Sequence, residues 1–159
     1  MEFTYDAYCG LYCGACTIMI ANQNGELEAL AKQWEMKVED LKCFGCKSGQ
    51  VAIFCTDCEI KACAEDKQLD FCFQCNEFPC ARMIEFRDDE KYPYHQVVFN
   101  NLEDIQQQGI SAWLKDQHVR WNCPNCGERF AWRDEVCKHC GGAVSNYTAD
   151  VTAQPAPVE

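Results

Sequence analysis

The stretch CPNCGERFAWRDEVCKHCGG, residues 123–142, contains two Cys-x-x-Cys pairs with ten residues between them. A glycine follows each pair directly, Gly127 after the first and Gly141 after the second. This pattern is typical of a zinc ribbon, in which each pair lies on a tight turn and the two pairs close one tetrahedral site. The expected ligands of this site are Cys123, Cys126, Cys137 and Cys140.

The same stretch predicts the local structure and the role of the metal. Phe130, Trp132 and Val136 fall on alternate positions, which favours a strand over residues 128–137. Four protein thiolates leave no open position for a substrate, so we expect a structural rather than a catalytic zinc ion.

Eleven further cysteines precede this stretch, and eleven ligands suggest three more sites with one ligand that is not cysteine. Proximity along the chain would group residues 43, 46, 55 and 58 in one site and residues 63, 72, 75 and 80 in another, although an interleaved arrangement fits equally well. His95 is a candidate for the missing ligand. The eleven candidate metal ligands are Cys9, Cys13, Cys16, Cys43, Cys46, Cys55, Cys58, Cys63, Cys72, Cys75 and Cys80.

The motif CGLYCGAC places Cys9, Cys13 and Cys16 in a C-x3-C-x2-C spacing. Enzymes that bind a three-cysteine iron–sulfur cluster and cleave S-adenosylmethionine share this spacing, but they are built on much larger α/β barrels. Zinc is the expected metal of the N-terminal part, and an iron–sulfur cluster is the alternative. The three local thiolates form either an open site or one closed by His95 or by a distant cysteine.

Composition explains why the fold needs metal. Cysteine accounts for 15 of the 159 residues, whereas Leu, Ile, Val and Phe together make up only about a fifth of the chain. Small domains with weak hydrophobic cores commonly depend on disulfides or metals. The N-terminus resembles no secretion signal and no apolar run could span a bilayer, so we expect a cytoplasmic protein with metal-bound thiolates rather than disulfides.

The charge balance divides the chain and bears on its partners. Residues 1–118 carry 10 basic and 20 acidic residues, whereas residues 119–143 carry four and three. We expect a cysteine-rich helical metal-binding domain over 1–118, the zinc ribbon over 119–143 and a disordered tail over 144–159. The acidic body argues against nucleic acid as a partner and favours a protein partner.

Apolar spacing predicts that the body is helical. Residues at intervals of three and four indicate helices over 26–34 and from residue 94 to Gly109, and Pro79 favours a helix through 81–86 with Cys80 in its first turn. The expected fold class is mainly α: a small, metal-stapled, cysteine-rich helical domain followed by a small β zinc ribbon.

The cysteine motifs of the body resemble a known family. The order CGLYCGAC, CFGC, FCTDCEIKACAEDK and FCFQCNEFPCARM over roughly residues 8–82 is similar to the cysteine-rich prokaryotic family called domain of unknown function 3795. Since that family has no assigned activity, the resemblance implies metal binding and a prokaryotic cytosolic setting but no reaction.

Two classes of function follow from these observations. The first is a non-enzymatic zinc protein that acts as an adaptor or partner-binding module, since no phosphate loop, acid/base pair or nucleophile motif stands out. The second is an iron–sulfur or thiol-redox protein that uses the Cys9, Cys13 and Cys16 site.

Overall fold

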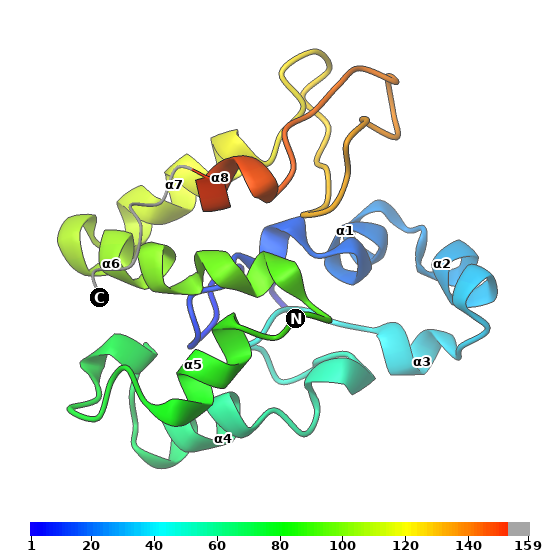
Figure 1. Ribbon diagram of the computed structural model, residues 1–159. Coiled ribbons are helices and arrows are strands. Elements are labelled where there is room, and N and C mark those ends of the chain that lie inside the picture. The colour runs from blue at the N-terminus through cyan, green and yellow to red at the C-terminus, as the bar shows by residue number, and fades with distance from the viewer. Residues whose placement is uncertain (153–159) are drawn as a thin grey trace.

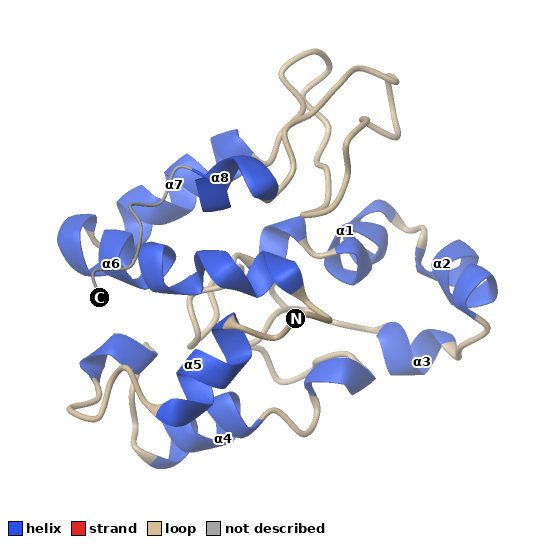
Figure 2. Cartoon of the chain, in the orientation of Figure 1, coloured by secondary structure: helices blue, strands red, loops and turns tan. Residues whose placement is uncertain are grey.

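The structure is a computed structural model that describes residues 1–152, and the described part is helical with long connecting loops (Figures 1 and 2). Residues 153–159, which belong to the expected disordered tail, lie outside the described residues. The α-helices are α1 (Thr17–Asn24), α2 (Leu27–Trp34), α3 (Val38–Leu41), α4 (Glu59–Asp66), α5 (Ala81–Arg87), α6 (Val98–Gln108), α7 (Ile110–Arg120) and α8 (Thr148–Thr152).

Four short 3-10 helices fall in the cysteine-rich loops and before α6. They are η1 (Cys13–Ala15), η2 (Ile53–Cys55), η3 (Cys72–Gln74) and η4 (Pro93–Val97). The helix expected around residues 81–86 is present as α5, but Cys80 precedes its first turn and accepts a hydrogen bond from the backbone N–H of Ile84 at 3.1 Å. The helix expected from residue 94 is η4 followed by α6, and it ends at Gly109 as predicted.

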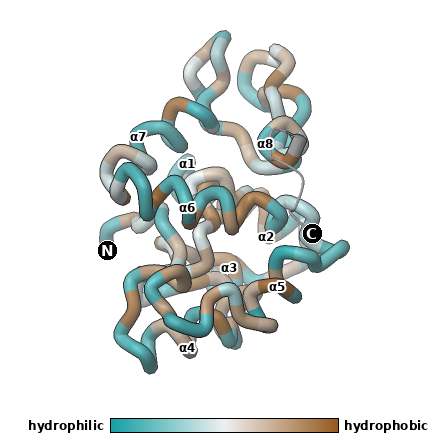
Figure 3. The backbone as a smooth tube through the Cα atoms, turned by 60° about the vertical axis from the view of Figure 1, so that its left-hand side comes forward, coloured by the Kyte–Doolittle hydropathy of each residue, from teal (hydrophilic) through white to brown (hydrophobic). Residues whose placement is uncertain are grey.

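The main hydrophobic core joins the N-terminal segment to α6 and α7. Hydrophobic and hydrophilic turns alternate along α6 in Figure 3, and α6 buries Val98, Leu102 and Ile105. Trp113 of α7 is 1% exposed, and the ring of Tyr12 packs edge-on against it with centroids 6.0 Å apart. Periodic apolar residues therefore form the core, as their spacing indicates.

A second, smaller core lies between α1, α2 and α3. It consists of Ile18, Ala21, Leu27, Ala31, Leu41, Cys43 and Ala52, with Cys16 packed at its edge. Cys9 belongs to the main core, with Cys13 and Cys46 packed against it. The two cores thus separate neighbouring cysteines of the CGLYCGAC motif.

Two glycines of the cysteine motifs allow segments to pack closely. Gly10 has φ +91°, and a Cβ there would meet the side chain of Leu102 and the carbonyl of Val98 on α6. Gly45 has φ +111°, and a Cβ there would collide with the backbone of Thr4. Both positions need the left-handed backbone and the absence of a side chain that only glycine combines without strain.

The prediction of a strand over residues 128–137 is wrong. In this part of the described chain the structure has two isolated antiparallel bridges, Asn122 with Arg129 and Val136 with Ala143. The segment between them bends because Asp134 closes a turn onto Ala131, and because the backbone N–H of Trp132 donates to Ala15 at 3.1 Å instead of to a neighbouring strand. Docking against the helical body replaces sheet pairing, so the β zinc ribbon is not formed as a sheet.

The described part of the expected tail also differs from the prediction. Over residues 144–152 the chain folds back, and α8 is held by Arg120, whose guanidinium donates to Asp150 at 2.9 Å and 3.1 Å. Tyr147 and Val151 pack against the main core. The division into domains stays a prediction, and its boundary at residue 119 falls within α7.

Candidate metal centre

Two turns of the same construction carry the cysteines of the C-terminal stretch. In the first turn Gly127 N–H donates to the carbonyl of Cys123 at 2.8 Å, and in the second Gly141 N–H donates to the carbonyl of Cys137 at 2.8 Å. The two glycines have φ of +80° and +74°, a backbone that favours glycine. Each turn therefore presents both of its thiols to the same side.

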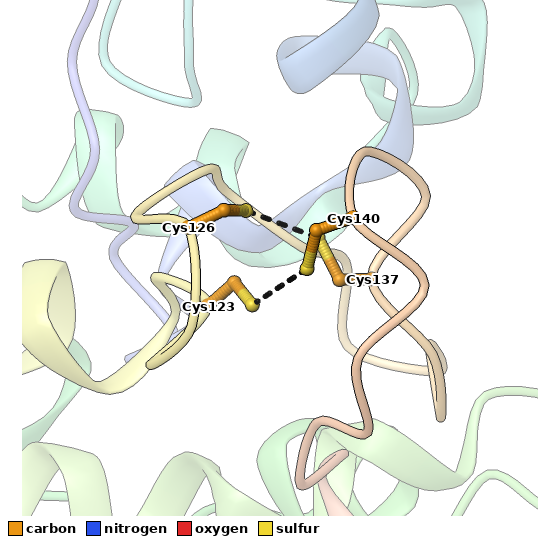
Figure 4. Close-up of side chains that lie close together, drawn as sticks. All are labelled: Cys123, Cys126, Cys137 and Cys140. Atoms are coloured by element: carbon orange, nitrogen blue, oxygen red, sulfur yellow. Dashed lines mark hydrogen bonds between the residues drawn. The ribbon is translucent and has the colours of Figure 1, made fainter.

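The four sulfurs of these turns meet in one place (Figure 4). The Sγ atoms of Cys123, Cys126, Cys137 and Cys140 all lie within 4.8 Å of one another. Cys123 Sγ is 3.7 Å from Cys140 Sγ, and Cys126 Sγ is 3.6 Å from Cys137 Sγ. A tetrahedral ion with metal–sulfur bonds of about 2.3 Å separates its ligands by about 3.8 Å. The four cysteines can therefore hold a metal ion.

Neighbouring groups stabilise the thiolate form of the most exposed ligand. The Asn125 amide donates to Cys140 Sγ at 3.3 Å, and the backbone N–H of Gly142 donates to the same sulfur at 3.4 Å. These hydrogen bonds, that of Asn125 first, lower the pKa of Cys140 to about 6. A metal ion would thus meet a ligand that is already deprotonated at neutral pH.

Replacing Asn125 with alanine is expected to weaken metal binding about tenfold, because groups that hydrogen-bond to a ligand typically contribute 10- to 100-fold to affinity. The pKa of Cys140 should rise, so that protons compete with the metal at higher pH and the midpoint of metal release moves upward. A zinc-competition titration with a chromogenic chelator at several pH values measures both effects. Asn24→Ala, at the exposed end of α1, is the control, and an unchanged affinity for Asn125→Ala would contradict this role.

Long-range contacts attach the metal centre to the helical body. The ring of Trp132 stacks on Tyr94 with centroids 4.3 Å apart, in addition to the hydrogen bond from its backbone to Ala15. Arg129 donates to the side chain of Gln23 on α1 at 3.0 Å. The two turns are therefore held against α1 and η4.

The eleven N-terminal cysteines are arranged differently. Among the described residues, no three of their sulfurs lie within 4.8 Å of one another. After burial, the largest influence on the thiol pKa of both Cys9 and Cys13 is the charge of Cys46, which raises it. For Cys16 the only charge that raises the pKa is that of Cys43. The CGLYCGAC cysteines are thus shared between two neighbourhoods, which favours the interleaved arrangement.

Four of the remaining cysteines form a further group, of which Cys72 also lies near Cys9 and Cys58. Cys63, Cys72, Cys75 and Cys80 line one pocket between α4, η3 and α5. After burial, the charges of Cys80, Cys63 and Cys75, in that order, raise the pKa of Cys72 to about 12. This group is the one that proximity along the chain predicts.

Among the described residues, no cluster of three or more candidate metal ligands includes His95. Its Nδ1 lies 3.1 Å from the carbonyl oxygen of Phe86, and its ring stacks on Phe86 with centroids 3.8 Å apart. Burial lowers its pKa to about 4, so the imidazole is neutral at pH 7. In this structure His95 is a core residue of an aromatic cluster, and its part as a metal ligand stays a prediction.

Sequence patterns missed Asn125, although its place between two ligands of one turn could have indicated a donor to sulfur. They also missed Lys67 and Arg82, which contact Cys75 and Cys63. Lys67 is eight residues from its partner and Arg82 nineteen, and no local pattern marks such pairs.

The fold and the site define a cysteine-rich helical protein with a cluster of four cysteines that could hold a metal ion. None of the helices in the described part of the chain is long and apolar enough to cross a bilayer.

Residues 5–85 match the family model described as Protein of unknown function (DUF3795). The match covers slightly more than half of the chain and all eleven N-terminal cysteines, so the chain belongs to this family. No curated protein and no solved structure matches the chain.

Proposed function

We propose that the four-cysteine centre holds a zinc ion and that the protein is a non-enzymatic module that binds a protein partner. The observation that carries this proposal is the group of four sulfurs, 3.6 Å and 3.7 Å apart in two pairs, on two matching turns. Zinc prefers a tetrahedral set of four thiolates and contributes its binding energy to folding. A complete set of protein ligands suits a structural ion.

The role of the zinc is to hold residues 121–147 against the helical body. Trp121 and Phe130 flank the first turn, and both are buried in the main core. Zinc therefore shapes one face of the protein, and we propose this face and the acidic body as the binding surface.

Native mass spectrometry of the full chain, purified without added metal, tests the zinc assignment. We expect a species that carries zinc at this centre and a Cys140→Ser variant that lacks one zinc. A chain with iron or no metal at these four cysteines would refute it.

Charge supports a basic protein partner. The chain has a formal net charge of -11, and zinc with four thiolates adds two further negative charges. Duplex DNA and RNA should consequently bind more weakly than in ordinary non-specific binding, whose Kd is roughly 10⁻⁴–10⁻⁶ M at physiological salt. Fluorescence anisotropy with labelled duplexes, at low and at physiological salt, measures this. A lysine-rich peptide of matched length is the comparison and should bind more tightly, and tight, salt-resistant binding of nucleic acid would overturn the proposal.

One observation favours the second class of function, an iron–sulfur or thiol-redox protein. It is the pocket lined by Cys63, Cys72, Cys75 and Cys80, rather than the Cys9, Cys13 and Cys16 motif.

A further inference from the structure

The pocket between α4 and α5, which lie in the lower half of Figure 1, has a volume of about 270 Å³. Cys63 comes from α4, Cys72 and Cys75 from η3 and its end, and Cys80 directly precedes α5. Apolar side chains complete much of the wall, among them Ile60, Leu69, Phe78 and Met83. Four thiols thus reach one partly apolar space from three short elements.

The spacing of these thiols differs from that of the C-terminal centre. There, four sulfurs lie within 4.8 Å of one another and fit a single ion, whereas no three sulfurs of the pocket meet that limit in the described structure. The four pocket cysteines surround an open volume instead of closing on a point. A cluster of four irons bridged by sulfide, held by four thiolates, places several atoms between its ligands and needs such a volume.

Two cationic side chains lie beside the pocket thiols. Lys67 Nζ lies 3.4 Å from Cys75 Sγ and 2.5 Å from Glu77 Oε2. Arg82 donates to Glu59 at 3.2 Å, and the neighbouring Cys63 helps to raise the pKa of its guanidinium. Both cations also line the pocket. Hydrogen bonds and positive charge at thiolate sulfur stabilise an anionic cluster and raise its reduction potential.

We propose that Cys63, Cys72, Cys75 and Cys80 bind a four-iron, four-sulfide cluster, with Lys67 and Arg82 as positioning residues that compensate its negative charge. This site is separate from the zinc centre and does not depend on the zinc assignment. The proposal rests on the second class of function named above and specifies its cofactor. The cluster forms from two ferrous ions, two ferric ions and four inorganic sulfides, so no further oxidant is needed. The four cysteines lose their protons to solvent and supply one thiolate to each iron, which gives a cluster with an overall charge of about -2.

Anaerobic reconstitution of the full chain with equal amounts of ferrous and ferric iron and with sulfide tests the site. We expect visible thiolate-to-iron charge-transfer absorption and about four irons and four acid-labile sulfides from this pocket. Cys75→Ser should lose that iron and sulfide while it keeps the zinc. Cys140→Ser should show the reverse, so failure of the zinc assignment and failure of the cluster assignment are distinguishable.

A second variant keeps all four thiols and tests the pocket if Cys75→Ser does not fold. Lys67→Met removes a donor and a positive charge beside Cys75, so the electron added on reduction is less well stabilised. We expect the equilibrium constant for reduction to fall about tenfold, which for one electron is about 59 mV to lower potential. Lys115→Met, on the exposed face of α7, is the matched control.

Three results would overturn the proposal. They are reconstituted protein that binds only zinc and no sulfide, a folded Cys75→Ser variant with undiminished iron and sulfide, and a Lys67→Met variant with an unchanged potential.

Discussion

Replacing Cys137 with serine is expected to unfold the C-terminal metal centre and to detach α8, while the helices of the body remain. Cys137 is 2% exposed and one of four ligands, so its loss leaves three thiolates around the ion. Structural zinc contributes about 10–16 kcal/mol in small zinc-binding peptides, which is as large as the whole stability of an ordinary domain. The two turns have no sheet to hold them once the metal is lost.

The body should survive because most of its main core comes from residues before the first turn. Leu11, Tyr12, Leu102 and Trp113 remain buried among themselves, although Trp121 and Phe130 are lost from the cluster. Hydrogen exchange measures the outcome: amides of residues 121–152 should exchange freely, and those of α6 should stay protected.

Val136→Ser is the control for this variant, since it adds a hydroxyl at a neighbouring position that is 53% exposed. This variant should keep its zinc, and its amides in residues 121–152 should stay protected from hydrogen exchange. A Cys137→Ser protein with one zinc at this centre and protected amides in the turns would show that the ligand assignment is wrong.

Removal of metal is expected to lower the melting temperature of the whole protein by tens of degrees. A ligand whose free concentration is a thousand times its Kd stabilises the folded state by about 4.1 kcal/mol. For a chain of this size each kcal/mol corresponds to about 2–4 °C, so every occupied site contributes roughly 10 °C. Many cysteines lie in 3-10 helices and loops, where little else orders the backbone.

Calorimetry before and after treatment with a strong chelator, without oxygen and with a reductant, measures this loss. Return of the metal should restore the melting temperature, and a calcium-selective chelator should change nothing. An unchanged melt after verified removal of all metal would show that the two hydrophobic cores suffice.

Local patterns predicted the helices and the C-terminal ligands well. The spacing of Leu27, Leu30 and Trp34 indicated α2, and two Cys-x-x-Cys pairs indicated a centre whose four sulfurs meet in the structure. These features depend on residues that are close along the chain. The absence of a strand at Trp132 was not predictable in this way, because its hydrogen-bond partner Ala15 lies more than a hundred residues earlier.

Proximity along the chain predicted the group of Cys63, Cys72, Cys75 and Cys80, but the arrangement of the cysteines before residue 50 was beyond local patterns. Cys13 and Cys16 are three residues apart, but one packs against the main core and the other against the second. Likewise, Cys46 packs against the main core, whereas Cys43 belongs to the second core. Only the packing of α1, α2 and α3 around the N-terminal segment determines which thiols are neighbours.

The hydrogen bond from Trp132 to the carbonyl of Ala15 links two distant parts of the protein. Ala15 lies in η1, between Cys13 and Cys16, and Trp132 lies between the two turns of the metal centre. An ion that orders the turns favours one conformation of η1, and a ligand that fixes η1 favours the turns. Where an ion at the turns and a ligand at η1 both depend on this contact, each must change the affinity of the other by the same factor.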